Sequence, residues 1–242
     1  MPQADIARAY LAALTNDLKN KSATNPQLAD FVKELETIDT SAIQRGPFPR
    51  LEHPTMAMLE TALKTAQGNA ALLPLAIEVA RVLDWGQIYD EGAMDPALAE
   101  GMLAAQAAGT YGCFAGKTIA TGLFLLAPGV NYALHTHAAT EIYYCLSGTI
   151  DIQHGIDAEP FDLTPGNYSI TPPDRVHSLS VRSEPVLMIY AWIGELSCPI
   201  WLWSQEANNR WIRERWMRKP GEPWKVEERE VISDAAMAAA HG

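Results

Sequence analysis

The chain has 242 residues and a formal net charge of −11 at pH 7, a size that suits one domain with an attached region. The acidic balance argues against a nucleic-acid-binding surface and favours small molecules as partners. Three cysteines without a CxxC pair indicate neither a disulfide framework nor a zinc ribbon. The start lacks a signal-peptide pattern and no stretch reaches the roughly 18 apolar residues of a membrane span, so we expect a cytoplasmic protein without a membrane partner.

Residues 1–112 are predicted to form an α-helical N-terminal region of four or five helices. Apolar residues recur at helical spacing between 28 and 35, after an Asn25-Pro26 start that supplies an N-cap and a favoured first-turn proline. Further helical segments, rich in alanine and leucine, are expected at 55–67, at 71–85 and after Asp95-Pro96.

From residue 118 the composition changes to β-branched and aromatic runs separated by glycine and proline. This pattern predicts strands at 118–126, 141–146, 149–153 and 186–193. We assign a β-barrel to residues 113–204. Because no long linker precedes it, we expect the helices to pack on the barrel.

Residues 205–242 are predicted to form a helical extension rich in tryptophan and arginine. Between 201 and 224, five tryptophans are interleaved with basic residues, a composition that can bind nucleic acid by stacking and charge. We favour an amphipathic helix that lies on the barrel or joins a homodimer, because the rest of the chain is acidic. The alanine-rich segment 233–240 is expected to fray.

Four candidate metal ligands fall in two segments: His135, His137 and Glu141 in the first, and His177 in the second. Side chains two residues apart on a strand point to the same side, so His135 and His137 share a face. A short bend lets Glu141 open the next strand toward the same interior, and a distant hairpin brings in His177. Three imidazoles and a carboxylate predict one divalent transition metal ion per chain, with zinc, manganese, iron, nickel and cobalt all compatible.

These residues carry a resemblance to the cupin family. The positions that match the first cupin motif are Gly129, His135, His137, Glu141 and Gly148. The positions that match the second motif are Gly166, Pro172 and His177. Asp174 stands where a glycine is usual and Val181 where an asparagine is usual. The resemblance implies a mainly β cupin fold, which is a small, antiparallel, jelly-roll-like β-barrel with a metal held inside by three histidines and one glutamate.

A narrower resemblance rests on Tyr143, two residues after Glu141, together with His177 and the segment 186–194. In these features the chain is similar to the cupin-type dimethylsulfoniopropionate lyases, whose longer members also have an N-terminal helical region. The resemblance implies a metal-dependent carbon–sulfur lyase that splits dimethylsulfoniopropionate, or a related small carboxylate, into dimethyl sulfide and acrylate by β-elimination. It also implies that Tyr143 is the general base, because a nearby dication favours the phenolate of a group whose pKa is ordinarily about 10.

The sulfonium group of such a substrate is a cation without hydrogen-bond donors, so aromatic faces are the natural way to bind it. Tyr190 and Trp192 share strand parity, and we expect both to face the interior as substrate contacts. Tyr132 is the candidate for a second polar tyrosine near the substrate. Val130 and Trp203 are the other positions at which relatives could place that residue.

Two further functions stay open at the level of the sequence. A metal-dependent dioxygenase could use the same ligand set with ferrous iron, which oxygen consumption would reveal. A non-catalytic cupin that binds a small molecule would keep its ligand affinity in a Tyr143→Phe variant and would have no turnover to lose.

Overall fold

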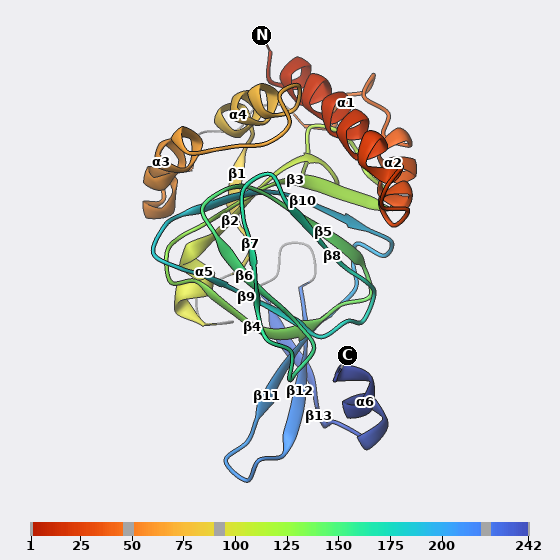
Figure 1. Ribbon diagram of the computed structural model, residues 1–242, viewed down its shortest axis with the longest axis vertical. Coiled ribbons are helices and arrows are strands. Elements are labelled where there is room, and N and C mark those ends of the chain that lie inside the picture. The colour runs from red at the N-terminus through yellow and green to blue at the C-terminus, as the bar shows by residue number, and fades with distance from the viewer. Residues whose placement is uncertain (1, 46–50, 90–94, 219–223, 242) are drawn as a thin grey trace.

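The computed structural model describes residues 2–45, 51–89, 95–218 and 224–241. It is mainly β, with two antiparallel sheets that face each other and helices outside one of them (Figure 1). This confirms the expected jelly-roll-like cupin fold. Among the described strands, backbone hydrogen bonding runs within each of the two sheets and does not join them into one closed ladder.

The first sheet has six strands in the order β1-β2-β3-β10-β5-β8. Their bounds are β1 (Trp85–Gln87), β2 (Met102–Ala108), β3 (Ile119–Leu126), β5 (Thr140–Ser147), β8 (Tyr168–Thr171) and β10 (Val186–Ile193). The second sheet has seven strands in the order β13-β12-β11-β4-β9-β6-β7. Their bounds are β4 (Asn131–Thr136), β6 (Ile150–His154), β7 (Phe161–Leu163), β9 (His177–Val181), β11 (Ile200–Gln205), β12 (Trp211–Met217) and β13 (Lys225–Val231).

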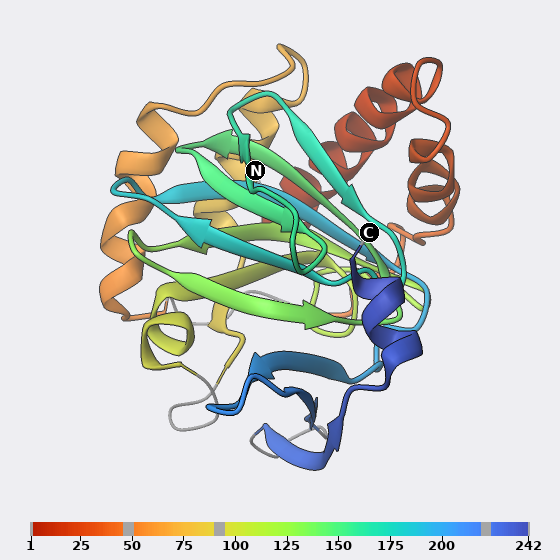
Figure 2. The same cartoon turned by 60° about the horizontal axis from the view of Figure 1, so that its bottom comes forward.

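Helices α1 to α4 cover the outer face of the first sheet (Figures 1 and 2), whereas α5 lies near β2 and β4 and α6 near the C-terminus. The helices are α1 (Gln3–Ser22), α2 (Leu28–Glu36), the 3-10 helix η1 (Pro54–Met58), α3 (Leu59–Lys64), α4 (Leu73–Val82), α5 (Pro96–Gly101) and α6 (Asp234–Ala240). Helices α1 to α4 and the outer face of the first sheet share one hydrophobic cluster. In the described residues, no helix combines the length and hydrophobicity needed to cross a membrane.

Strand β10 shows why the central strands of the first sheet are apolar along their whole length. Leu187, Ile189 and Ala191 pack in the cluster shared with the helices, whereas Met188 and Tyr190 belong to the cluster between the sheets. Because alternate side chains point to opposite faces, both faces of the strand are buried. The face toward the second sheet is the one that lines the site.

Most predicted elements of residues 1–204 are confirmed, including α5 with Asp95 as its N-cap. The longest helix, α1, is not among the predicted segments, and β2 lies within the region predicted to be helical. The run Met102–Ala108 is rich in alanine, which favours a helix by intrinsic propensity. Pairing along β3 overrides that preference.

The prediction of a helical extension over 205–242 is wrong for most of its length. Strand β12 pairs with β11, and β13 pairs with β12, so that both extend the second sheet. The two strands project from the body of the molecule (Figure 1). The alternation of β12 has the period of a strand, since Trp211, Arg213 and Arg215 are two residues apart. Among the described residues of this segment, only those of α6 are helical, and the Ser233 side chain accepts a hydrogen bond from the backbone N–H of Ala236.

The packing of α1 on the first sheet predicts the effect of a truncation. Leu14 is 1% exposed and lies in the cluster that joins helix and sheet. Leu14→Ala should lower the free energy of unfolding by about 2–5 kcal/mol, because it leaves a cavity in a close-packed core. Chemical denaturation measures the change. Ile43→Ala is the control, because Ile43 is 57% exposed; equal losses in both variants would contradict this packing.

Candidate metal centre and active site

Three histidines from two neighbouring strands converge between the sheets. His135 lies on β4, His137 follows the last residue of β4, and His177 is the first residue of β9. In the antiparallel ladder His135 is directly opposite His177, and their ring centroids are 3.9 Å apart. The centroids of His137 and His177 are 4.9 Å apart. The structure therefore brings together the two sequence segments that the spacing singled out.

The turn before β9 explains how an aspartate can replace the glycine of the second cupin motif. Asp174 has a φ of +59°, in the left-handed region that favours glycine. Aspartate is among the few other residues that enter this region, because its short side chain can bond locally. The backbone N–H of Asp174 donates to the carbonyl of His137 at 2.9 Å, so the turn is tied to the first ligand segment.

Each of the three imidazoles is oriented by a bond from Nδ1 to a backbone carbonyl. The accepting oxygens belong to Ala133 for His135 (2.8 Å), Ala139 for His137 (3.0 Å) and Arg175 for His177 (2.9 Å). Because a carbonyl oxygen only accepts, each Nδ1 carries a proton, which leaves Nε2 as the nitrogen of each ring that is able to bind a metal. Bonds of this kind orient metal-binding histidines and raise their basicity.

Glu141 on β5 completes the cluster from the opposite sheet. Its Oε2 is 3.2 Å from Nε2 of His137 and 3.6 Å from Nε2 of His177. Burial acts to raise the pKa of Glu141, but hydrogen-bonding and charge interactions with the imidazoles of His137 and His177 outweigh it and hold the pKa at about 2. A cation held by these rings would act on the carboxylate in the same direction. The group is therefore a carboxylate at neutral pH.

The cluster has the properties of a cation site. Burial, and then the proximity of His177 and His137, lower the pKa of His135 well below its ordinary value, so this ring is neutral, the form that binds metals. Ligand atoms of the three histidines lie within 4.8 Å of one another, and Nε2 of His177 is buried without a hydrogen-bond partner. A cation bound between the histidine Nε2 atoms and the buried carboxylate of Glu141 would be stabilised by all of these groups. The buried triad of histidines is thus able to bind a metal.

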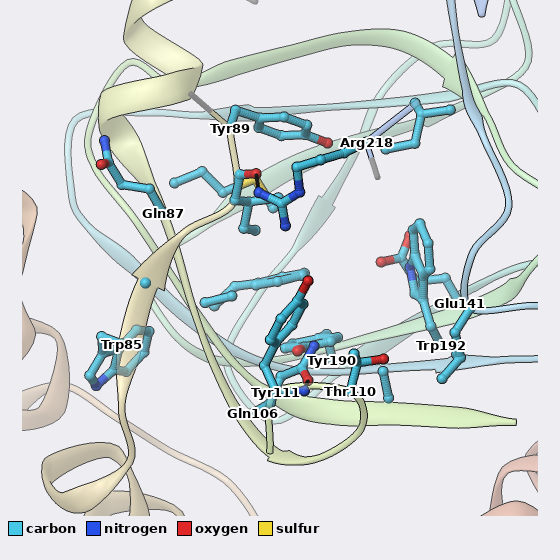
Figure 3. Close-up of a pocket in the computed structure, with 18 of the residues that line it drawn as sticks. Trp85, Gln87, Tyr89, Gln106, Thr110, Tyr111, Glu141, Tyr190, Trp192 and Arg218 are labelled. Carbon is cyan, nitrogen blue, oxygen red and sulfur yellow. Dashed lines mark hydrogen bonds between the residues drawn. The ribbon is translucent and has the colours of Figure 1, made fainter. Parts of the chain in front are cut away.

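A cavity of about 810 Å³ opens beside this cluster, and both His135 and Glu141 contribute to its wall. Figure 3 shows Glu141 and Trp192 on one side of the cavity, with Tyr89 and Arg218 across it. Much of the remaining wall is aromatic. Such a mixture of apolar walls and a few convergent polar groups is typical of a small-molecule site.

Tyr143 lines the cavity, as its position two residues after Glu141 on β5 requires. Its side chain is buried, and burial, reinforced by the negative charge of Glu141, raises the pKa of Tyr143 well above its ordinary value. The neighbouring Tyr144 points to the opposite face, where its hydroxyl contacts Lys21 of α1 at 3.2 Å. The same strand thus supplies one tyrosine to the site and one to the helical layer.

Tyr132 reaches the site because β4 is irregular. In a regular strand, residues three apart face opposite sides, but the ladder between β4 and β9 shifts between Tyr132 and His135. The ring of Tyr132 therefore stacks on that of His135, with centroids 3.7 Å apart and planes 8° from parallel. Val130 and Trp203, the alternative positions for a second polar tyrosine, are not among the described residues that line the cavity.

Tyr190 and Trp192 both line the cavity, as their shared parity on β10 predicts. Tyr190 stacks on Phe124 of β3, with a centroid separation of 3.9 Å. Trp192 lies 4.4 Å from the ring of His137, and its Nε1 is buried without a hydrogen-bond partner among the described residues. Trp192 therefore contacts the histidine cluster at His137, as Tyr132 does at His135.

Several residues of the cavity wall could not be singled out from the sequence, among them Tyr89, Arg218 and Trp224. Tyr89 follows β1 in the region expected to be helical, and nothing in its spacing relates it to the metal ligands. Arg218 and Trp224 belong to the segment of interleaved tryptophans and arginines for which the sequence predicts a helix. The period-two pattern of 211–217 was an available signal for a strand, but it does not indicate that the following residues reach the site.

Comparisons with known proteins agree with this geometry. The family model for dimethylsulfoniopropionate lyase matches residues 13–188. The chain is similar to the dimethylsulfoniopropionate lyase DddQ of Ruegeria pomeroyi, with 25% identity over 176 residues, which cover 72% of this chain and 84% of the relative.

Solved structures show the same fold. A crystal structure of DddQ from Ruegeria pomeroyi aligns with a TM-score of 0.60 at 23% identity, over 81% of this chain and 96% of that one. A structure reported for the dimethylsulfoniopropionate lyases RdDddP and RnDddQII aligns with a TM-score of 0.57 at 19% identity, over 78% of this chain and 94% of that one. Because the family model spans well over half of the sequence, the chain belongs to the dimethylsulfoniopropionate lyase family of carbon–sulfur lyases.

Proposed function

We propose that this protein cleaves dimethylsulfoniopropionate to dimethyl sulfide and acrylate by a metal-dependent β-elimination. One observation carries the proposal beyond family membership: the histidine cluster, Glu141 and Tyr143 belong to one buried site whose cavity is walled by aromatic rings. A small zwitterion with a carboxylate and a sulfonium group matches that combination of charge and aromatic surface.

The four residues proposed to hold one divalent transition metal are His135, His137, Glu141 and His177. Two observations support this assignment: the orientation of the three imidazole rings, and the buried Nε2 of His177, which has no hydrogen-bond partner among the described residues. When bound there, the metal supplies Lewis-acid stabilisation of the negative charge that develops on the substrate carboxylate. Nitrogen and oxygen donors of this kind accept zinc, manganese, iron, nickel or cobalt, so the identity of the ion depends on its availability.

Tyr143 is the proposed general base. Its phenolate oxygen takes the proton from the carbon next to the carboxylate, the electron pair of that C–H bond becomes the new double bond, and the bond to sulfur breaks. Dimethyl sulfide leaves with the sulfur electron pair, and acrylate and a tyrosine phenol remain. Because burial and Glu141 raise the pKa of Tyr143, the base form depends on positive charge in the site to offset them.

Aromatic side chains around the cavity are the proposed substrate contacts. The faces of Tyr190 and Trp192 provide electron density for a sulfonium group, which has no hydrogen-bond donors. Tyr132 adds a hydroxyl close to the metal cluster, since its ring stacks on His135. The site therefore offers separate environments for the two charged ends of the substrate.

A homodimer, a cytoplasmic location and the absence of a nucleic-acid partner stay predictions. The ion pairs on the C-terminal strands favour a protein or solvent environment over nucleic acid, because arginines there already contact carboxylates. Arg213 pairs with Glu230 and Arg215 with Glu227, and the guanidinium of Arg213 lies 4.4 Å from the ring centre of Trp201. The half-buried tryptophan surface is of the kind found at protein interfaces.

Removal of one proposed ligand should remove metal and activity together. His177→Gln should lower the affinity for a divalent ion by at least about tenfold, because a neutral imidazole donor is lost. Metal content after dialysis against a competing chelator measures the change. His154→Gln is the matched control, because His154 faces His177 across the ladder, but its Nε2 bonds Oγ1 of Thr171 at 3.2 Å. Equal metal content in both variants would exclude His177 as a ligand.

Loss of the Tyr143 hydroxyl should separate catalysis from metal binding. Tyr143→Phe should lower kcat by about 10²–10⁴-fold, the range for a positioned general base, while the metal stays bound. Acrylate formation from dimethylsulfoniopropionate measures the rate. Tyr144→Phe removes a hydroxyl from the other face of the same strand and should keep near-normal turnover. Turnover that survives in Tyr143→Phe would exclude this residue as the base.

The activity itself is tested with protein stripped of metal and reloaded with each candidate ion. We expect dimethyl sulfide and acrylate in equal amounts with at least one ion, and no product from the stripped protein. Absence of product with all five ions would overturn the proposed function.

A further inference from the structure

The hairpin of β12 and β13 reaches the active site although it lies beyond the residues matched by the family model. Two side chains from it donate to one acceptor, the backbone carbonyl of Ile88. Nη1 of Arg218 lies 3.0 Å and Nε1 of Trp224 lies 2.8 Å from that oxygen. A carbonyl oxygen has two electron pairs, so both bonds can form at once. The hairpin is therefore bonded to the residue immediately before Tyr89.

Tyr89 is held between the hairpin and the site. Its ring lies against that of Trp224, with centroids 5.3 Å apart, and meets the ring of Tyr132 edge-on at 5.7 Å. Its hydroxyl is hydrogen-bonded to the hydroxyl of Tyr132. Both tyrosines are buried and both line the cavity. Figure 3 shows Tyr89 beside Arg218 at the same end of the cavity.

The contact continues to the metal cluster, because the ring of Tyr132 stacks on His135. A continuous series of contacts thus leads from the hairpin through Ile88 and Tyr89 to Tyr132 and a proposed metal ligand. The two hydroxyls have two protons between them, and their mutual hydrogen bond uses one. The second O–H is left to donate to an acceptor in the cavity, such as a carboxylate oxygen.

We propose that the C-terminal hairpin is a positioning element of the active site: it holds Tyr89, and Tyr89 fixes the hydroxyl of Tyr132 where it donates to the substrate carboxylate. This inference rests on the proposed function for its catalytic consequence. The positions of the tyrosines themselves do not depend on it. Tyr89 acts through Tyr132, so Tyr89 is a positioning residue, and Arg218 and Trp224 act one step further away.

The first experiment reads the position of Tyr132 without turnover. 3-Fluorotyrosine placed at position 132 of the full chain gives a ¹⁹F resonance that reports on the hydrogen bond of its hydroxyl. We expect this resonance to move in Tyr89→Phe and in the double variant Arg218→Met/Trp224→Phe, which removes both donors to Ile88. Tyr168→Phe is the control, because the Tyr168 hydroxyl accepts from Nδ2 of Asn25 at 3.2 Å outside the cavity. An unchanged resonance in the hairpin variant would overturn the proposal.

The second experiment is a double-mutant cycle on kcat/KM for dimethylsulfoniopropionate. Tyr89→Phe should lower kcat/KM by about two- to tenfold, the effect of one neutral hydrogen bond. If Tyr89 acts through the hydroxyl of Tyr132, then Tyr89→Phe should cost nothing further in a Tyr132→Phe background. Arg215→Gln, on the same hairpin but paired with Glu227, should leave kcat/KM unchanged.

The outcomes separate this proposal from the proposed function. Additive losses in the cycle, or full activity of Tyr89→Phe, would overturn the positioning role even in an active lyase. A wild-type protein that does not cleave dimethylsulfoniopropionate with any ion would overturn the proposed function instead. In that case the ¹⁹F resonance still decides whether the hairpin sets the hydroxyl of Tyr132.

Discussion

The structure depends on one electrostatic constraint: the carboxylate of Glu141 and the imidazoles of His135, His137 and His177 are buried together between the two sheets. Bonds from Nδ1 to backbone carbonyls fix the ring orientations, so that the Nε2 atoms of His137 and His177 face Glu141. In an apolar interior such a cluster is costly unless a cation lies within it. The fold supplies the strands β4, β9 and β5 and the ordered turn that make this arrangement, and the cavity chemistry follows from it.

The convergence of His135, His137 and His177 was predictable from the sequence because the relevant information is local and periodic. His135, His137 and Glu141 lie within seven residues, and strand parity orients them. The turn before His177 was also foreseeable, although its aspartate at φ +59° shows that the backbone conformation mattered more than the glycine. The position of Tyr132 could not be predicted from strand parity, because residues three apart on a regular strand face opposite sides. The shift in the ladder between β4 and β9 is what brings its ring onto that of His135.

The rest of the cavity wall depends on long-range packing that no spacing rule encodes. Tyr89 and Arg218 are 129 positions apart in the chain, and they meet because the C-terminal strands extend the sheet that carries His135. The period-two pattern of β12 was present in the sequence, but arginine and tryptophan at those positions also suit an amphipathic helix. Tertiary pairing decided between the two, as it did for the alanine-rich β2.

The most direct test of this account is anomalous X-ray scattering from crystals of the protein loaded with one divalent transition metal. The account predicts a single strong peak within coordination distance of Nε2 of His135, His137 and His177 and of a carboxylate oxygen of Glu141. A metal-loaded crystal with no peak there, or with a peak held by other residues, would contradict it.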